Sequence, residues 1–236
     1  MKFKEEIISF LYPRRCPVCD EIVERGKDIC DACRKKIIFL EEPLCKKCGK
    51  IIDDERKEYC GDCRRKKHFF TQGKGLFSYE KEMKLCMYRF KYSNKREYGD
   101  FFAKEAVKRH GAWMKHMGIE VIVPIPMYVW KKRKRGYNQA EVFAKRLSAE
   151  SGVPLESKMV CRIRDTVPQK ELNDVQRKNN LKNAFKINRN IVKYRKILLV
   201  DDIYTTGSTM DAVAGLLRQA GVKEVYCICI CIGNGY

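Results

Sequence analysis

The sequence has no apolar stretch long enough to span a bilayer, which excludes a transmembrane helix. It also lacks a secretory signal at its start, because Glu5 and Glu6 interrupt residues 1–12 and the apolar run there is too short. We therefore expect a cytoplasmic protein, with peripheral association at the inner face of the membrane as a secondary expectation.

Acidic residues are scarce relative to basic ones. The 236 residues include 50 Lys and Arg against 30 Asp and Glu, for a net charge of +20. Residues 1–70 hold 18 basic and 14 acidic side chains, so residues 71–236 hold the other 32 and 16 and most of the excess. Such a charge favours polyanionic partners: nucleic acid, phosphorylated small molecules or an anionic membrane. Hydrophobic residues make up 44% of the chain, so a core can form and global disorder is excluded.

Histidine is rare, with three residues at spacings that suit no metal site, so metal binding would fall to the 13 cysteines. Eight of them form four C-x-x-C pairs, separated by 10, 11 and 11 residues. Thiols stay reduced in the cytoplasm, so these pairs predict metal ligands rather than disulfides. The candidate ligands are Cys16, Cys19, Cys30, Cys33, Cys45, Cys48, Cys60 and Cys63.

Four thiolates suit zinc, which occupies tetrahedral sites without redox chemistry. The simplest pairing joins neighbours in the sequence and gives two sites, while an interleaved pairing and an iron–sulfur cluster stay open. A segment this short needs metal to fold, so we expect two structural zinc ions, with docking of DNA or protein as the alternative role. Among the other cysteines, Cys227, Cys229 and Cys231 alternate along a predicted strand and should share one buried face.

No Gly/Ser-rich or Pro-rich linker divides the chain, so its two predicted parts should pack together. We expect an amino-terminal helix and a double zinc ribbon over residues 1–70, and an α/β domain over residues 71–236. In the second part, apolar runs alternate with helical periodicity, which indicates a mainly parallel sheet with ligands at the carboxyl ends of its strands. The predicted strands are residues 75–79, 121–126, 197–200 and 225–232, and the predicted helices are residues 138–151 and 208–220.

The stretch ILLVDDIYTTGST, residues 197–209, carries the most chemical information. An apolar strand ends in Asp201 and Asp202, and Gly207 lets the following loop turn sharply into a helix. The N–H groups of the loop and the helix start form an anion cradle. Ribose 5-phosphate is the ligand that this stretch predicts, because two carboxyls can bind its diol beside the cradled phosphate. The loop hydroxyls come from Thr205, Thr206, Ser208 and Thr209.

A basic run, residues 131–135, follows a predicted strand and should reach the same edge of the sheet. It could neutralise a pyrophosphate, or it could form only a solvated charged surface. Tyr128, Trp130 and Tyr137 interleave with this run, an arrangement that could stack the bases of single-stranded nucleic acid while lysines contact phosphates.

The 197–209 stretch resembles the phosphoribosyl-pyrophosphate (PRPP) signature of type I phosphoribosyltransferases. The chain as a whole is similar to the ComF family of competence-associated proteins. This similarity implies a type I phosphoribosyltransferase fold, an α/β fold with a mostly parallel five-stranded core sheet and flanking helices. It covers the cysteine-rich ribbon, residues 123–126, residues 135–139, and TVPQ at 166–169 followed by Leu172, Arg177, Asn180, Ala184 and Phe185.

The resemblance also implies roles for individual residues. Asp201 and Asp202 would hold the ribose hydroxyls, residues 205–209 would hold the 5-phosphate, and Mg²⁺ would arrive with the pyrophosphate. Residues 127–135 fall at the position of the pyrophosphate loop, and residues 162–182 at that of the loop that closes over PRPP. The implied pyrophosphate contacts are Lys131, Arg133, Arg135, Arg164, Gln169 and Arg177, with Arg135 as the first choice.

Three functions are compatible with the sequence. The first is a ComF-type protein that binds PRPP and single-stranded DNA and acts in DNA uptake during natural transformation, alongside a DNA-uptake helicase or recombination proteins. The second is an active phosphoribosyltransferase that transfers ribose 5-phosphate to an unidentified nitrogen nucleophile. The third is a scaffold that senses PRPP. We expect the first, and the second is compatible with it.

Overall fold

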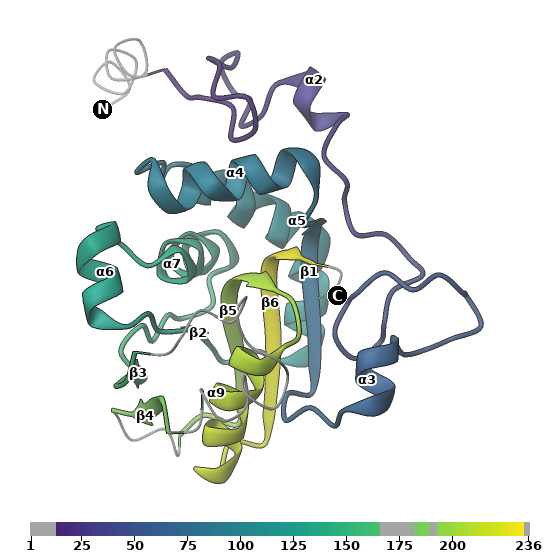
Figure 1. Cartoon of the computed structure of the whole chain (residues 1–236), viewed down its shortest axis with the longest axis vertical. Coiled ribbons are helices and arrows are strands. Elements are labelled where there is room, and N and C mark those ends of the chain that lie inside the picture. Colours follow the sequence, from purple (N-terminus) through teal and green to yellow (C-terminus); the bar gives the residue numbers. More distant parts are fainter. Residues whose placement is uncertain (1–12, 166–180, 182, 189–192, 234–236) are drawn as a thin grey trace.

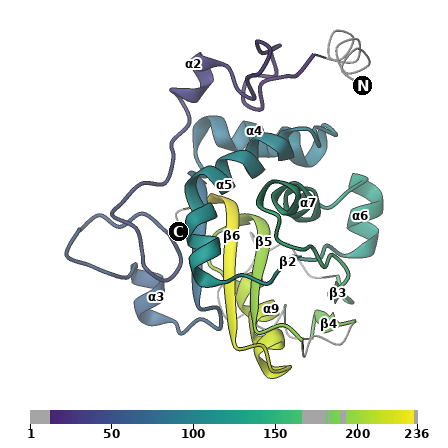
Figure 2. The same cartoon turned by 180° about the vertical axis from the view of Figure 1, so that it is seen from behind.

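The computed structural model of the chain describes residues 13–165, 181, 183–188 and 193–233. In this part a parallel sheet carries helices on both faces, and the cysteine-rich segment runs past one edge of it (Figures 1 and 2). The predicted amino-terminal helix would precede the first cysteine, in residues that lie outside the described part. None of the described helices combines the length and apolar composition needed to cross a membrane.

The central sheet has four described strands, and all three pairings between them are parallel. Their apolar runs are buried on both faces, as expected for a parallel sheet. An isolated parallel bridge joins Ile122 to Leu155 beside the outer strand. The expected five strands thus correspond, in the described residues, to four strands and this bridge. The order across the sheet is β1 (Gln72–Ser78), β6 (Glu224–Ile232), β5 (Lys196–Tyr204) and β2 (Val121–Pro124).

Helices cover both faces of this sheet (Figures 1 and 2). One face carries α4 (Lys81–Tyr92), α5 (Tyr98–Met117) and α7 (Gln139–Ser151), and the other carries α9 (Ser208–Gln219). Helix α6 (Val129–Arg135) lies beside α7. The shorter elements are α2 (Asp31–Arg34), α3 (Gly61–Arg65) and the antiparallel pair β3 (Val160–Arg162) and β4 (Phe185–Ile187).

The two halves of the cysteine-rich segment contribute to opposite sides of the core. Cys16 and Cys33 belong to the apolar cluster on the α4 and α5 side, whereas Cys45 and Cys48 belong to the cluster on the α9 side. Between the halves, the chain forms an antiparallel bridge with β1 through Phe39 and thereby covers the edge of the sheet. The two parts of the chain pack together, as predicted.

Two details of the strands differ from the sequence predictions. β5 continues to Tyr204, so the acid pair lies within the strand and not at its last residues. The prediction that Cys227, Cys229 and Cys231 share one face is wrong for Cys231. The first two pack in the cluster on the α9 side, but Ile230 and Cys231 both pack in the opposite cluster. The alternation of side chains along β6 therefore breaks at this point.

Candidate functional site

The acid pair lies in the carboxyl-terminal half of β5, toward the edge at which parallel sheets bind ligands. Asp201 and Asp202 are both half-buried. The Asp202 N–H donates to Asp201 Oδ1 at 2.8 Å, and the Ile203 N–H donates to Asp202 Oδ1 at 2.7 Å. Burial, followed by the charge of Asp202, raises the pKa of Asp201 to about 8.

A residue that sequence reasoning missed, Lys91 near the end of α4, faces this pair. Its Nζ lies 2.8 Å from Asp202 Oδ2, and the two side chains are 20% and 16% exposed. Burial by itself lowers the pKa of Lys91, but the charges of Asp202 and Asp201 outweigh it, so the pKa is raised. Lys91 directly follows Phe90, the last buried residue of α4. This position beside the buried face of the helix was the one sequence feature that could have pointed to Lys91.

Residues 205–209 turn the chain from β5 into α9. Gly207 has a φ of 73°, and a Cβ atom there would lie 2.5 Å from the Tyr204 hydroxyl oxygen, so this position requires glycine. Gly207 is also the N-cap of α9 and has no side chain to satisfy the first N–H groups of the helix. The hydroxyls of Thr206 and Ser208 lie 3.0 Å apart in the same turn. Helix dipole, backbone N–H groups and hydroxyls are the groups that bind anions in proteins, and phosphate binding by this loop stays a prediction.

Two of the basic candidates in α6 contact polar or aromatic side chains nearby. Arg135 donates to Gln139 Oε1 at 2.7 Å and to the Tyr92 hydroxyl at 3.3 Å. The Arg133 guanidinium lies 4.9 Å from the centre of the Trp130 ring. Tyr92 follows directly after the lysine of the ion pair, so Arg135 is connected to the edge of the acid-pair site.

The remaining pyrophosphate candidates lie near β3 or beyond the described residues. Lys131 Nζ lies 2.6 Å from Asp165 Oδ1, in the segment that follows β3. Arg164 is exposed in the same segment. Gln169 and Arg177 lie outside the described residues. Contact of these side chains with a pyrophosphate stays a prediction.

The three aromatic residues predicted to stack bases differ in exposure. Trp130 is 62% exposed, and Tyr128 is half-buried. The prediction is wrong for Tyr137, which is buried and donates its hydroxyl proton to the Phe90 carbonyl. Gly136, in the left-handed conformation, ends α6 and turns the chain back into the core, and this turn buries Tyr137.

A cavity of about 500 Å³ lies along the outer face of α9. Among the described residues predicted to hold the phosphoribosyl group, Ser208 alone lines it. Asp211 also lines it, but its Oδ2 lies 2.7 Å from His68 Nδ1 and 2.6 Å from Lys66 Nζ. These contacts join α9 to the segment after the second ribbon half, and we assign the cavity no ligand.

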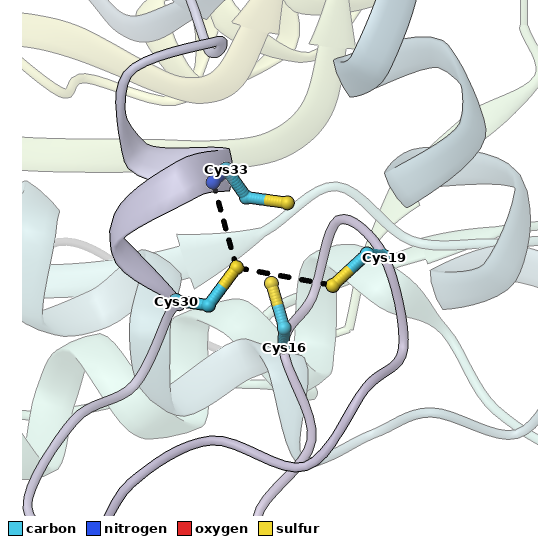
Figure 3. A group of neighbouring side chains, drawn as sticks. All are labelled: Cys16, Cys19, Cys30 and Cys33. Atoms are coloured by element: carbon cyan, nitrogen blue, oxygen red, sulfur yellow. Dashed lines mark hydrogen bonds between the residues drawn. The ribbon is translucent and has the colours of Figure 1, made fainter.

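The eight ribbon cysteines form two groups that join neighbours in the sequence, and the interleaved pairing does not occur. Within each group all four sulfurs lie within 4.8 Å of one another. Figure 3 shows how the four side chains of the first group come together. Cys19 and Cys30 have their sulfurs 3.9 Å apart, and Cys48 and Cys60 have theirs 3.6 Å apart. A tetrahedral zinc ion with Zn–S bonds of about 2.3 Å requires sulfurs about 3.8 Å apart. Both groups therefore fit a zinc ion.

Comparison with known proteins agrees with both parts of the chain. A family described as a double zinc ribbon domain matches residues 7–64, and one described as a phosphoribosyl transferase domain matches residues 110–236. Competence protein F of Haemophilus influenzae is 30% identical over 89% of this chain and 93% of its own length. DNA utilization protein YhgH of Escherichia coli K12 is 27% identical over 93% and 97%. Competence protein ComFC of Bacillus subtilis is 25% identical over 85% and 82%.

The two four-cysteine groups and the strand–loop–helix with its acid pair thus lie in the regions that these two families cover. The relatives match almost the whole chain, ribbon and sheet together. The chain belongs to the ComF family of competence proteins, in which a double zinc ribbon precedes a phosphoribosyltransferase domain.

Proposed function

We propose that this protein binds PRPP at the end of β5 and acts with single-stranded DNA in DNA uptake. One observation carries the PRPP part: Asp201 and Asp202 precede a glycine-dependent anion loop in a single strand-to-helix turn. Carboxyls accept hydrogen bonds from a diol, and the amino end of a helix binds a phosphate. Ribose 5-phosphate carries both groups on one sugar.

In bound PRPP, the pyrophosphate group would point from the ribose toward the basic side chains of α6. Lys131, Arg133 and Arg135 supply positive charge on that side, and Lys91 supplies one more beside the acid pair. Mg²⁺ would arrive bound to the pyrophosphate, and the acid pair offers the carboxylate oxygens that this cation prefers. The protein's own side chains would hold the ribose and offset the negative charge of the phosphates.

Calorimetric titration with PRPP and Mg²⁺ tests the site. We expect Asp202→Asn to lower the affinity about 10-fold or more, because a charge-assisted hydrogen bond to the ribose is lost. The fold should persist, since Asp202 is only half-buried and asparagine has nearly the same shape as aspartate. Asp100→Asn is the matched control, because Asp100 also pairs with a cation, Arg146 at 2.9 Å, but on α5. Equal affinities of Asp202→Asn and wild type would refute the site.

The DNA part is supported by the relatives and by charge. Relatives are named for competence and for DNA utilization, and residues 71–236 hold 32 basic against 16 acidic side chains. We expect binding to a labelled single strand whose log affinity falls with log salt by about 0.7 for each phosphate contacted. A strand that does not bind at low salt would end this part of the proposal. If the strand does bind, we expect the protein to pass it on to a DNA-uptake helicase or a recombination protein.

An active transferase is the second candidate, because residues 110–236 match a phosphoribosyl transferase domain. A nitrogen nucleophile would form a bond to C1 of PRPP while the bond from C1 to pyrophosphate breaks. The site would contribute positioning and charge stabilisation. Release of pyrophosphate, measured with a panel of amines and nucleobases, tests this candidate; no release with any of them would leave PRPP as a ligand only.

A further inference from the structure

Helix α4 presents an exposed stripe of large apolar side chains to solvent. Leu85, Tyr88 and Tyr92 recur at helical spacing and are 60%, 61% and 60% exposed. On the neighbouring α6, Val129 and Trp130 are 50% and 62% exposed. Scattered apolar residues on a surface are ordinary, but five large ones on two helices that are in contact through Arg135 and Tyr92 call for an explanation. We call these five side chains, together with Arg133, Lys134 and Arg135, the α4–α6 face.

Contacts within each helix, and one between them, hold the rings of this face in place. The rings of Tyr88 and Tyr92 lie 5.1 Å apart. The Arg135 guanidinium lies 4.9 Å from the centre of the Tyr92 ring, and its Nη2 donates to the Tyr92 hydroxyl at 3.3 Å. Within α6, the Arg133 guanidinium lies 4.9 Å from the centre of the Trp130 ring. Because these rings are held before a ligand arrives, binding costs less side-chain entropy than it would for mobile rings.

The charge of this face selects the kind of ligand. The sequence of α6 is VWKKRKR, which places five cations beside the exposed tryptophan. Lys131 and Lys132 pair with Asp165 and Glu141, so the charge offered to a ligand comes from the three cations that follow them. A purely apolar partner would have to desolvate these cations, whereas a polyanion with flat rings satisfies the cations and the aromatic side chains together. In a duplex the base faces are stacked on each other, so only a single strand can offer them to tyrosine and tryptophan.

We propose that the α4–α6 face is a stacking platform for single-stranded nucleic acid, in which Tyr88, Tyr92 and Trp130 receive bases while Arg133 and Lys134 contact phosphates. This inference rests on the proposed binding of DNA and adds its location and mode. The platform adjoins the acid-pair site, because Lys91, which contacts Asp202, directly precedes Tyr92. A bound strand would therefore pass along the edge of the proposed PRPP site.

The test is equilibrium binding of a labelled single-stranded oligothymidylate at low salt. We expect Tyr88→Ala and Trp130→Ala each to lower the affinity by about 5- to 100-fold, the range for loss of one stacked base. Tyr59→Ala is the control, because Tyr59 is an exposed tyrosine on the ribbon, away from this face; its affinity should equal that of wild type. Far-UV circular dichroism and urea unfolding of Tyr88→Ala and Trp130→Ala should match wild type, which shows that both variants fold.

A spectroscopic measurement checks the stacking directly. The chain has two tryptophans, and in the Trp113→Phe variant Trp130 is the only one left. Its emission should fall when the strand is added, as a base covers the indole.

The outcomes separate this inference from the proposed function. If wild type binds the strand but Tyr88→Ala and Trp130→Ala bind it equally well, the platform is refuted while the proposed DNA binding stands. If a duplex of the same sequence binds as tightly as the strand, or Trp130 emission does not change, stacking is refuted as well. If wild type binds no strand, both fail, and the titration with PRPP still decides the other site.

Discussion

Lys91 and Asp202 form an ion pair from helix α4 to strand β5, with 2.8 Å between Nζ and Oδ2. A second pair near the end of the same helix, Lys95 Nζ with Asp20 Oδ1, has the same length and similar exposure. The first pair faces the proposed PRPP site, whereas the second joins the chain to the ribbon. The two lysines therefore offer a matched comparison of a binding role with a structural one.

We predict that Lys91→Met weakens PRPP binding about 10-fold, because the ligand is a polyanion and this ammonium is the cation beside the ribose-binding carboxyls. Lys91→Arg should keep most of the affinity, since it keeps the charge. Lys95→Met should leave PRPP affinity unchanged and lower the free energy of unfolding by about 0.5–1 kcal/mol. Calorimetry and urea unfolding measure both quantities. Tight PRPP binding by Lys91→Met would limit this lysine to a structural role.

Gly207 supports a second prediction, with Gly152 as its control. Both have nearly the same φ, 73° and 74°, but a Cβ at Gly152 would have nothing within 4 Å. Gly152→Ala should therefore cost only the conformational strain, about 1 kcal/mol of unfolding free energy. Gly207→Ala must in addition displace the Tyr204 ring, so we expect a loss of about 2–4 kcal/mol and no measurable PRPP binding. Equal losses in the two variants would contradict the crowding at Gly207.

Local sequence patterns were sufficient for the ribbon and for the strand–loop–helix. The C-x-x-C pairs and the order of apolar strand, acids and glycine loop are contiguous, so their geometry follows from a few residues. The length of β5 was harder to predict, because Ile203 and Tyr204 join the strand through pairing with Cys231 and Ile232, far along the chain. The burial of Tyr137 likewise depends on a turn at Gly136 and on contact with Phe90.

The residues that complete the proposed sites come from distant helices and carry no local signature. Lys91 is one of several lysines in α4, and only packing of that helix against the sheet shows which of them meets Asp202. The same holds for Tyr92, whose place on the α4–α6 face depends on Arg135 of a helix that begins more than thirty residues later. Such pairs require the tertiary arrangement and could not be predicted from periodicity.

The raised pKa of Asp201 predicts how stability depends on pH. The pKa rises from 3.8 to about 8 on folding, chiefly through burial, so between these values the folded protein binds more protons than the unfolded chain. This group therefore stabilises the fold fully below pH 3.8, and its contribution is lost as pH rises toward 8. In Asp201→Asn this loss disappears, so the variant should gain stability relative to wild type across that range. Urea unfolding of both proteins at a series of pH values measures the difference, and a difference independent of pH would contradict the assignment.

The ribbon supports the last prediction, because its cysteines belong to both sides of the core of the chain. We expect two zinc ions per chain, one for each cysteine group, and loss of one ion in Cys48→Ser, whose sulfur lies in the second group. That variant should also lose several kcal/mol of unfolding free energy. Cys48 packs in the cluster on the α9 side, and metal binding contributes directly to the folding of the ribbon. Cys86→Ala is the control: Cys86 is fully buried but belongs to neither group, so it should keep both ions. Metal analysis and thermal unfolding measure these effects, and a Cys48→Ser protein that retains two zinc ions and the stability of wild type would rule out this ligand set.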